Sequence, residues 1–450
     1  MGVKVFPSQE SVLSYEWPQN GELNPWYFIY QPTSYKLNGR NGTRAELRQM
    51  IQTCRSKGVR VYADAVTNHM SGGGNDVWES HRNGNGGGCA LWGAKASTGG
   101  DPFFTQDFMY LRSNNTQQEP GMEYPGAAYI ATDFHCERSL SSWSDPFQLN
   151  YGWLVGLSDL DTESDYVRDR IAAHMVDLLS IGFSGYRMDA AKHIQPESIA
   201  AILKKVKDKL GGGDLPDDYM TYLEVIMGGE MGLLMCNDGP YNFGKSFEDK
   251  MRAAGLSDND IYKVKIWESA YPKEFPECGS WQIPSERFVA ENDCHDDQNP
   301  GSSSRDMQDK GSVLIKDKDV NKHRYFEQLL FDRTDGNWQI KTVLSSYTFM
   351  NNGAAGFPDG KSSCSKCVGD QCNSCSKSME YSAAFDDGSC GYDCEVNGQW
   401  QEGVYTRVHR DQAIINSMRK WMGLSQEEDP TRLGLGPHCA ATAAKPEQFL

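Results

Sequence analysis

The chain has 450 residues and a formal net charge of −17. It contains no apolar run near the roughly 20 residues that a membrane-spanning helix needs. The acidic balance argues against nucleic acid and against an anionic membrane as partners, because both are negatively charged. A chain of this length can bury one large core or two to three smaller ones.

Residues 2–66 have the pattern of a strand, a helix and a second strand. The apolar segment 2–8 is the first predicted strand, so we expect no secretion signal at the start of this sequence. Thr43 and Glu46 match a capping box and start a helix that runs to about Ser56. Residues 59–66 are the next strand. This order with short links is typical of the βαβ unit of a parallel sheet.

The alternation stops between residues 67 and 160, where the sequence is dense in Gly, Asn, Asp, Trp and Ser. The stretch is too long for a loop, so it predicts an inserted subdomain. The alternation then resumes, with helices predicted at 165–180, 197–210, 322–333 and 411–422 and strands at 183–189, 222–226, 264–267, 287–290 and 342–347. About seven repeats of strand and helix indicate a (β/α) barrel or a doubly wound sheet.

Several predicted strands end in polar or acidic side chains. These are Asp64, Asn68 and His69 on one strand, Arg187, Asp189, Lys192 and His193 on a second, Glu224 on a third, and His295 and Asp296 on a fourth. In a barrel the carboxyl ends of all strands meet on one face, where active sites lie. A single acidic strand end is usually a solvated residue or a helix cap, but four together favour a functional site.

Arg187 and Asp189 lie two residues apart, so their side chains point to the same face of a strand. A guanidinium beside a carboxylate keeps that carboxylate ionised, which a covalent nucleophile requires. The alternative for this pair alone is a structural ion pair.

Carboxylates without a nucleophilic Ser or Cys point to glycoside hydrolysis, in which one carboxylate attacks and another donates a proton. Glu224 lies between apolar neighbours, which suits a raised pKa and the role of the acid. The aromatic residues Trp26, Tyr27 and Tyr30 could stack on sugar rings, and core packing is the alternative for each of them.

Thirteen cysteines are many for a cytosolic protein, and the odd number leaves at least one thiol unpaired within the chain. Six of them cluster at Cys364, Cys367, Cys372, Cys375, Cys390 and Cys394. This spacing fits either a zinc knuckle or a disulfide-stapled loop. We favour disulfides because the flanking sequence is rich in Gly, Ser and Asp.

Four segments, in order, resemble the motifs of the α-amylase family of retaining glycosidases, in its animal-type branch. They are 64–69, 185–193, 224–226 and 295–296, and the segment 26–37 is similar to the family's aromatic substrate-binding region. The resemblance covers roughly residues 2–425 and implies an α/β fold, a (β/α)8 TIM barrel with a subdomain inserted after the third barrel strand.

The barrel is expected to be incomplete, with seven recognisable strands, because the sequence opens on what resembles the second strand and ends without the family's C-terminal β domain. The resemblance implies the following limits: a first barrel segment at 1–67, an inserted calcium-binding subdomain at 68–160, a second barrel segment at 161–425 with a Cys-rich loop at 360–398, and a tail at 426–450.

The resemblance also implies roles for matching residues. Asp189 would be the nucleophile, Glu224 the general acid/base and Asp296 the third acid. Substrate would contact Trp26, Tyr27, Tyr30, Gln31, His69, Arg187, Lys192, His193 and His295. A structural Ca²⁺ would be held by Asn68, Asp159 and the His193 carbonyl, with Asn150 as a fourth ligand through its backbone oxygen, an oxygen-rich set that suits this ion.

The sequence departs from the family at the expected chloride site. Arg187 matches one chloride ligand, but Cys294 and Thr342 occupy two other ligand positions. These departures argue against chloride dependence.

The resemblance implies a secreted, monomeric enzyme that hydrolyses internal α-1,4-glucosidic bonds of starch, glycogen and maltooligosaccharides. One alternative is an α-glucosidase or glucanotransferase of the same family, against which the Lys192-His193 pair argues. Another is an inactive, truncated glucan-binding product.

Overall fold

The computed structural model describes residues 2–12, 26–72, 103–104, 109–110, 122–124, 126–135, 138–226, 234, 241–269, 277–278, 281–291, 328, 331, 334–335, 338–339, 341–344, 394–396, 399–401 and 412–433. The chain divides into two compact units. The first contains Met1–Ile266, Pro276–Ile283 and Pro358–Ser363, and the second contains Trp267–Phe275, Pro284–Phe357 and Cys364–Leu450.

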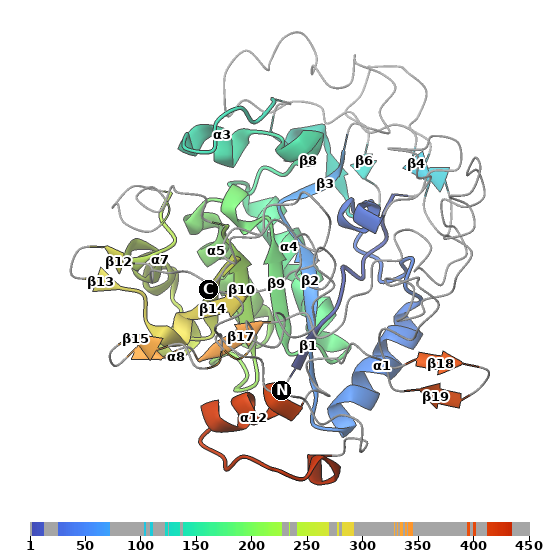
Figure 1. Cartoon of the computed structure of the whole chain (residues 1–450). Coiled ribbons are helices and arrows are strands. Elements are labelled where there is room, and N and C mark those ends of the chain that lie inside the picture. Colours follow the sequence, from blue (N-terminus) through green and yellow to red (C-terminus); the bar gives the residue numbers. More distant parts are fainter. Residues whose placement is uncertain are drawn as a thin grey trace. The chain divides into compact units, whose positions relative to one another are not determined.

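Within the described residues, seven strands form the main sheet, in the order β1-β2-β9-β10-β11-β14-β17 (Figure 1). They are β1 (Gly2–Lys4), β2 (Arg60–Val66), β9 (Gly185–Asp189), β10 (Met220–Glu224), β11 (Val264–Ser269), β14 (Phe288–Glu291) and β17 (Thr342–Leu344). Strand β1 pairs with β2, β2 with β9, β9 with β10 and β14 with β17, all in parallel.

Each strand of this sheet lies beside the next one along the chain, without the reversal of order that marks a doubly wound sheet. The fold is therefore an incomplete (β/α)8 barrel, as the sequence predicted. The predicted strands 2–8, 183–189 and 222–226 match β1, β9 and β10, with ends that differ by up to four residues.

The helices of the structure are α1 (Arg44–Ser56), α3 (Pro146–Tyr151), α4 (Asp165–Ser180), α5 (Pro196–Lys209), α7 (Lys245–Ala254), α8 (Asp258–Ile261) and α12 (Gln412–Trp421). The capping box at the start of α1 is present, with Thr43 accepting from Glu46 and the Glu46 carboxylate accepting from the Thr43 backbone. The sequence missed α3, α7 and α8. The predicted helix 322–333 is described only at residues 328 and 331, which are both helical. Five cysteines of the predicted cluster lie outside the described residues, and the pairing of these cysteines stays a prediction.

The core of the first unit is built where α4 packs against the sheet. Val61, Ala63 and Ala65 of β2 are fully buried, as are Ile171 and Met175 of α4. Burial on both faces explains why β2 is almost continuously apolar. Among the described residues, no helix is both long and apolar enough to cross a membrane.

Gly185 allows β9 to approach β10 closely. Its φ is +140°, and a Cβ added there would lie 1.8 Å from the Met220 carbonyl oxygen. Only glycine tolerates this conformation and this distance. Glycine is therefore required at position 185, the first residue of the strand that carries Arg187 and Asp189.

Short antiparallel pairs lie outside the main sheet. They are β3 (His69–Gly72) with β8 (Leu157–Asp159), β4 (Phe103–Phe104) with β5 (Met109–Tyr110), β6 (Met122–Tyr124) with β7 (Tyr129–Ile130), β12 (Glu277–Cys278) with β13 (Trp281–Gln282), β15 (Thr334–Asp335) with β16 (Trp338–Gln339), and β18 (Cys394–Val396) with β19 (Gln399–Gln401). The β3–β8 pair joins the two ends of the predicted insertion at 68–160.

The remaining elements are single 3₁₀ turns. They are η1 (Trp26–Tyr30), η4 (Ala131–Asp133), η5 (Leu154–Gly156), η6 (Ala191–His193), η7 (Ser285–Arg287) and η11 (Pro430–Leu433). Two of them, η1 and η6, carry residues that the sequence predicted to contact substrate. The domain limits inferred from the resemblance stay a prediction.

Candidate active site

The carboxyl ends of β2, β9 and β10 lie side by side, and those of β9 and β10 bring together two of the three predicted catalytic residues, Asp189 and Glu224. In the sheet register Asp64 pairs with Arg187, and Val66 pairs with Asp189. On the other side Tyr222 pairs with Arg187, so that Glu224, the last residue of β10, lies level with Asp189. Three strands that are distant in sequence therefore place their polar ends side by side.

The guanidinium of Arg187 binds three carboxylates. Its Nη1 donates to Asp64 Oδ1 and to Asp189 Oδ1, each at 2.7 Å, and its Nη2 donates to Glu224 Oε1. Arg187 is 2% exposed, and Asp189 and Glu224 are each 7% exposed. The predicted Arg187–Asp189 pair is present, but it belongs to a cluster in which one guanidinium binds three acids.

Burial governs the electrostatics of this cluster. It raises the pKa of Glu224 to about 7; the Arg187 charge opposes this rise and the Asp189 charge reinforces it. Burial lowers the pKa of Arg187, but the three carboxylates more than compensate, so that this pKa lies well above its ordinary value. The guanidinium is therefore always charged, while Glu224 can carry a proton near neutral pH.

A strained turn after β9 holds the second oxygen of Glu224. The backbone N–H of Ala190 donates to Glu224 Oε2 at 2.7 Å. Ala190 has a φ of +49°, in the left-handed region that residues other than glycine rarely adopt. Strain of this kind persists where surrounding contacts impose it, often at functional sites.

Asp64 is the inner anchor of the cluster, a role that the sequence did not predict. Its Oδ2 accepts from the Tyr30 hydroxyl at 2.8 Å and from Lys4 Nζ at 3.2 Å. The Arg187 guanidinium also lies 5.8 Å from the centre of the Tyr30 ring. Tyr30 therefore contacts both members of the Asp64–Arg187 ion pair.

Further predicted substrate residues surround η1. His69 donates its Nε2 hydrogen to the Tyr30 carbonyl at 3.0 Å, and burial lowers its pKa to about 4, so it is neutral at pH 7. The Gln31 side chain accepts from the backbone of Gly72 at 3.1 Å. Both contacts fix η1 against β3.

Some predicted residues are only partly described. Tyr27 is half-buried, and its ring meets Phe28 edge-on. The Trp26 side chain, His295 and Asp296 lie outside the described residues.

Lys192 and His193 lie in η6 against an aromatic side chain that the sequence did not single out. Lys192 Nζ donates to the Ile226 carbonyl at 2.8 Å and lies 5.3 Å from the centre of the Trp143 ring. The same ring meets His193 edge-on at 5.8 Å. His193 donates its Nδ1 hydrogen to the Leu149 carbonyl, and burial lowers its pKa to about 3.

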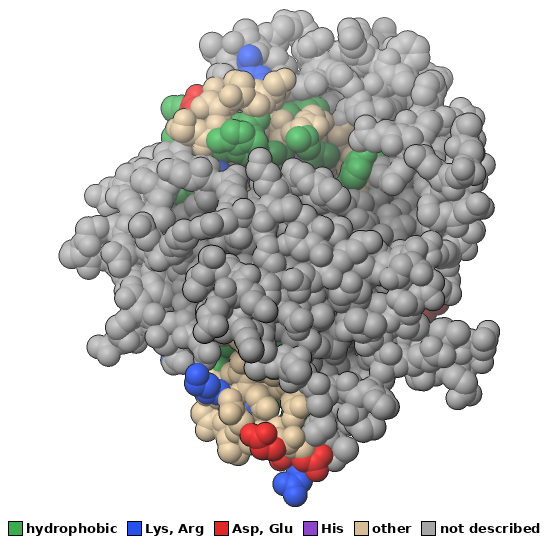
Figure 2. Space-filling model, viewed as in Figure 1, with side chains coloured by type: hydrophobic (Ala, Val, Ile, Leu, Met, Phe, Trp, Pro, Cys, Tyr) green, Lys and Arg blue, Asp and Glu red, His purple; other side chains and the backbone are tan. Residues whose placement is uncertain are grey.

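Trp143 is half exposed at 53%, as a sugar-stacking residue would be. Figure 2 shows hydrophobic side chains gathered at the surface around α3, where Trp143 and Phe147 are exposed. The available sequence signal was a lone Trp in a segment otherwise rich in Ser and Asp.

Two of the predicted calcium ligands lie together. Asn68 Nδ2 contacts Asp159 Oδ1 at 3.1 Å, and β3 pairs with β8 at His69 and Asp159. Both side chains are buried and carry oxygen donors, which fits a Ca²⁺ ion. The Asn150 side chain lies elsewhere, because its Nδ2 donates to Glu163 Oε1 at 2.8 Å.

Comparison with known proteins identifies relatives of this chain. Residues 27–224 match the family model described as alpha amylase, catalytic domain. Pancreatic alpha-amylase 2a5 of Mus musculus is 30% identical over 409 residues, which are 89% of this chain and 69% of that protein. The chain belongs to the α-amylase family.

Other members of the α-amylase family match over shorter stretches. Pancreatic alpha-amylase of Sus scrofa is 33% identical over 66% of this chain and 52% of its own length. Alpha-amylase of Thermomonospora curvata is 38% identical over 47% of this chain and 29% of its own length. The chain therefore spans between about a third and two thirds of these relatives.

A solved structure supports the fold of this α-amylase-family chain. Wild-type alpha-amylase I from Eisenia fetida matches with a TM-score of 0.53 at 21% identity, covering 93% of this chain and 72% of that one.

Replacing Asp64 with Asn should destabilise this α-amylase-family chain by about 3 kcal/mol, because Arg187 and Lys4 each lose a buried carboxylate partner. Urea unfolding would measure the change. The matched control is Asp177→Asn, which removes a surface ion pair with Arg44 and should cost less than about 1 kcal/mol. Equal, small losses for both variants would contradict the anchoring role of Asp64.

Proposed function

We propose that the protein hydrolyses internal α-1,4-glucosidic bonds of starch and glycogen with retention of configuration. The observation that carries this proposal is the binding of Asp189 and Glu224 to one buried guanidinium at adjacent strand ends. Membership of the α-amylase family supports a glycosidase. A mutant of the Eisenia fetida enzyme was solved with maltohexaose, which supports a linear α-glucan as substrate class.

In the first step Asp189 attacks the anomeric carbon of the sugar. A bond forms between a carboxylate oxygen and that carbon, while the bond to the leaving oxygen breaks. Arg187 donates to Asp189 Oδ1 at 2.7 Å, and this contact orients the carboxylate for the attack.

Glu224 supplies the proton that the leaving oxygen takes up. A pKa of about 7 keeps much of this group protonated at neutral pH, which a general acid needs. In the second step Glu224 removes a proton from water, the water oxygen attacks the anomeric carbon, and the bond to Asp189 breaks. Asp296 is proposed as the third acid, by resemblance.

Aromatic and basic side chains beside this centre would hold the glucan. Trp143, with Lys192 and His193 packed against its ring, offers a stacking face and donors on one side. Tyr30 and His69 lie on the side of β2. We propose them, with Trp26, Tyr27, Gln31 and His295, as the substrate contacts.

We also propose a structural Ca²⁺ ion. Asn68, Asp159 and the His193 carbonyl would hold it, with Asn150 as a further ligand through its backbone oxygen. The ion would supply no chemistry to the reaction and would tie β3 and β8 to η6. By the same resemblance we propose that the enzyme is secreted and acts as a monomer. Because Cys294 and Thr342 stand at two expected chloride-ligand positions, we propose that it does not depend on chloride.

Replacing Asp189 with Asn should lower kcat on starch by about 10³-fold or more, because the nucleophile is lost. Release of reducing sugar measures the rate, and Asp177→Asn on the distant surface of α4 is the control with the same change of charge. Retention of a tenth of the activity in Asp189→Asn would overturn the proposal.

The products formed from maltooligosaccharides distinguish the alternative activities. Internal cleavage supports an α-amylase, release of single glucose units supports an α-glucosidase, and products longer than the substrate support a glucanotransferase.

The pKa of Glu224 predicts the alkaline side of the pH profile. Because the protonated form donates, kcat/KM should fall as pH rises through about 7. An aryl maltoside whose leaving group needs no proton should show a weaker fall and should lose less rate in Glu224→Gln. If Glu224→Gln slowed hydrolysis of the aryl maltoside as much as hydrolysis of starch, Glu224 would not be the acid.

Removal of calcium should lower the melting temperature, because an ion that binds only the folded state stabilises it. Thermal unfolding with EDTA, and again after Ca²⁺ is restored, would measure this shift. In Asn68→Ala the shift should shrink, whereas Asn259→Ala on the surface should leave it unchanged. An identical melting temperature with and without EDTA would count against the ion.

A further inference from the structure

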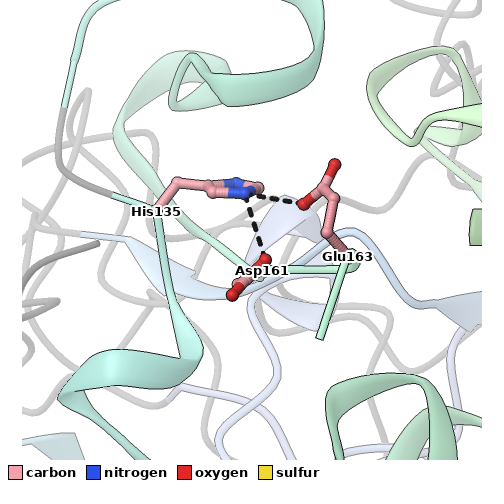
Figure 3. Close-up of side chains that lie close together, drawn as sticks. All are labelled: His135, Asp161 and Glu163. Atoms are coloured by element: carbon pink, nitrogen blue, oxygen red, sulfur yellow. Dashed lines mark hydrogen bonds and ion pairs between the residues drawn. The ribbon is translucent and has the colours of Figure 1, made fainter. Parts of the chain in front are cut away.

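A second polar cluster lies next to the proposed calcium ligands and takes no part in the proposed reaction. His135 Nδ1 contacts Asp159 Oδ2 at 2.6 Å, and its Nε2 contacts Glu163 Oε2 at 2.9 Å and Asp161 Oδ1 at 3.5 Å. Figure 3 shows the imidazole facing the two carboxylates, which come from the segment just before α4. His135 and Asp161 are each 2% exposed.

The two ring nitrogens of His135 have different partners. On one side the ring meets Asp159, an arrangement in which an outer carboxylate accepts the Nδ1 hydrogen and directs Nε2 toward a metal. On the other side Nε2 meets two carboxylates that, when ionised, only accept. A neutral imidazole with its proton on Nδ1 would point a lone pair at these oxygens, so a cation is needed between them. That cation is either a proton on Nε2 or a metal ion.

A further buried oxygen belongs to the same group. Asn150 is 2% exposed, and its Nδ2 donates to Glu163 Oε1 at 2.8 Å. Its Oδ1 is buried and has no hydrogen-bond partner among the described residues. A buried carbonyl oxygen without a donor costs free energy, and a cation beside Glu163 would satisfy it.

The carboxylates of this cluster surround the imidazole. Asp159 meets one ring nitrogen of His135, and Asp161 and Glu163 meet the other. One ligand atom from each of His135, Asp161 and Glu163 already lies within 4.8 Å of the others.

We propose that His135 Nε2, Asp161 and Glu163 bind a divalent transition-metal ion of the zinc class, with Asn150 Oδ1 as a fourth ligand. Imidazole with carboxylates is a set that such ions accept, whereas Ca²⁺ takes oxygen ligands. The site is distinct from the proposed calcium site, but Asp159 touches both, because its Oδ1 faces Asn68 and its Oδ2 faces His135. The metal displaces the Nε2 proton to solvent, and no bond to carbon changes.

The ion would fix the predicted insertion to the barrel. His135 belongs to the insertion, and its carbonyl accepts from Trp153 Nε1 at 3.2 Å. Asp161 and Glu163 lie in the segment just before α4. The side chain of Glu163 is 29% exposed, which gives the ion a route from solvent.

Titration of the whole chain with Co²⁺ in saturating Ca²⁺ would test the site, because Co²⁺ replaces Zn²⁺ and absorbs visible light. The wild-type protein should bind one Co²⁺ that Ca²⁺ does not displace, and Glu163→Gln should bind this ion at least 10-fold more weakly. Asp165→Asn is the matched control, since it removes the same charge two residues away at a position that is 84% exposed. Circular dichroism would confirm that both variants fold.

Three results would overturn the proposal: equal Co²⁺ binding by wild type and Glu163→Gln, equal weakening in Asp165→Asn, or full displacement by Ca²⁺. Cobalt held by the predicted cysteine cluster would show thiolate charge-transfer absorption that Glu163→Gln leaves unchanged. As a second readout, Zn²⁺ should raise the melting temperature of wild type but not of Glu163→Gln. Neither readout depends on starch hydrolysis, so the result is independent of the proposed function.

Discussion

The site depends on one buried guanidinium that binds carboxylates from three strands. Removing charges from water is costly, and Arg187 offsets that cost only because Asp64, Asp189 and Glu224 all reach it. This requirement fixes the register of β2, β9 and β10, since a shift of one residue would turn the carboxylates to the other face. The fold and the chemistry therefore share one constraint.

Two backbone features make this arrangement possible. Gly185 lets β9 approach β10 at a distance that no side chain would allow, and the left-handed Ala190 directs an N–H at Glu224. The result is a division of roles between acids that bind the same cation. Asp64 is held by further donors, Asp189 shares Arg187 Nη1 with Asp64, and Glu224 is the acid whose pKa reaches about 7.

The sequence predicted what depends on local pattern. Period-two alternation placed Arg187 and Asp189 on one face, and the spacing of Thr43 and Glu46 predicted the cap that the structure shows. It did not predict the anchoring role of Asp64 or the packing of Trp143 on Lys192, because these contacts join residues far apart in the chain. The His135 cluster was missed for the same reason, since no metal motif has its spacing. Asp296 and His295 lie outside the described residues, so their roles remain predictions.

The central claim is that the Arg187 cluster presents Asp189 as a nucleophile. A fluorinated maltosyl fluoride forms a slowly hydrolysed adduct with such a carboxylate, and peptide mass spectrometry can locate it. The account predicts one sugar adduct per chain, on the peptide that contains Asp189, and none on Asp64. An adduct on another carboxylate, or an unlabelled enzyme that still hydrolyses starch, would contradict it.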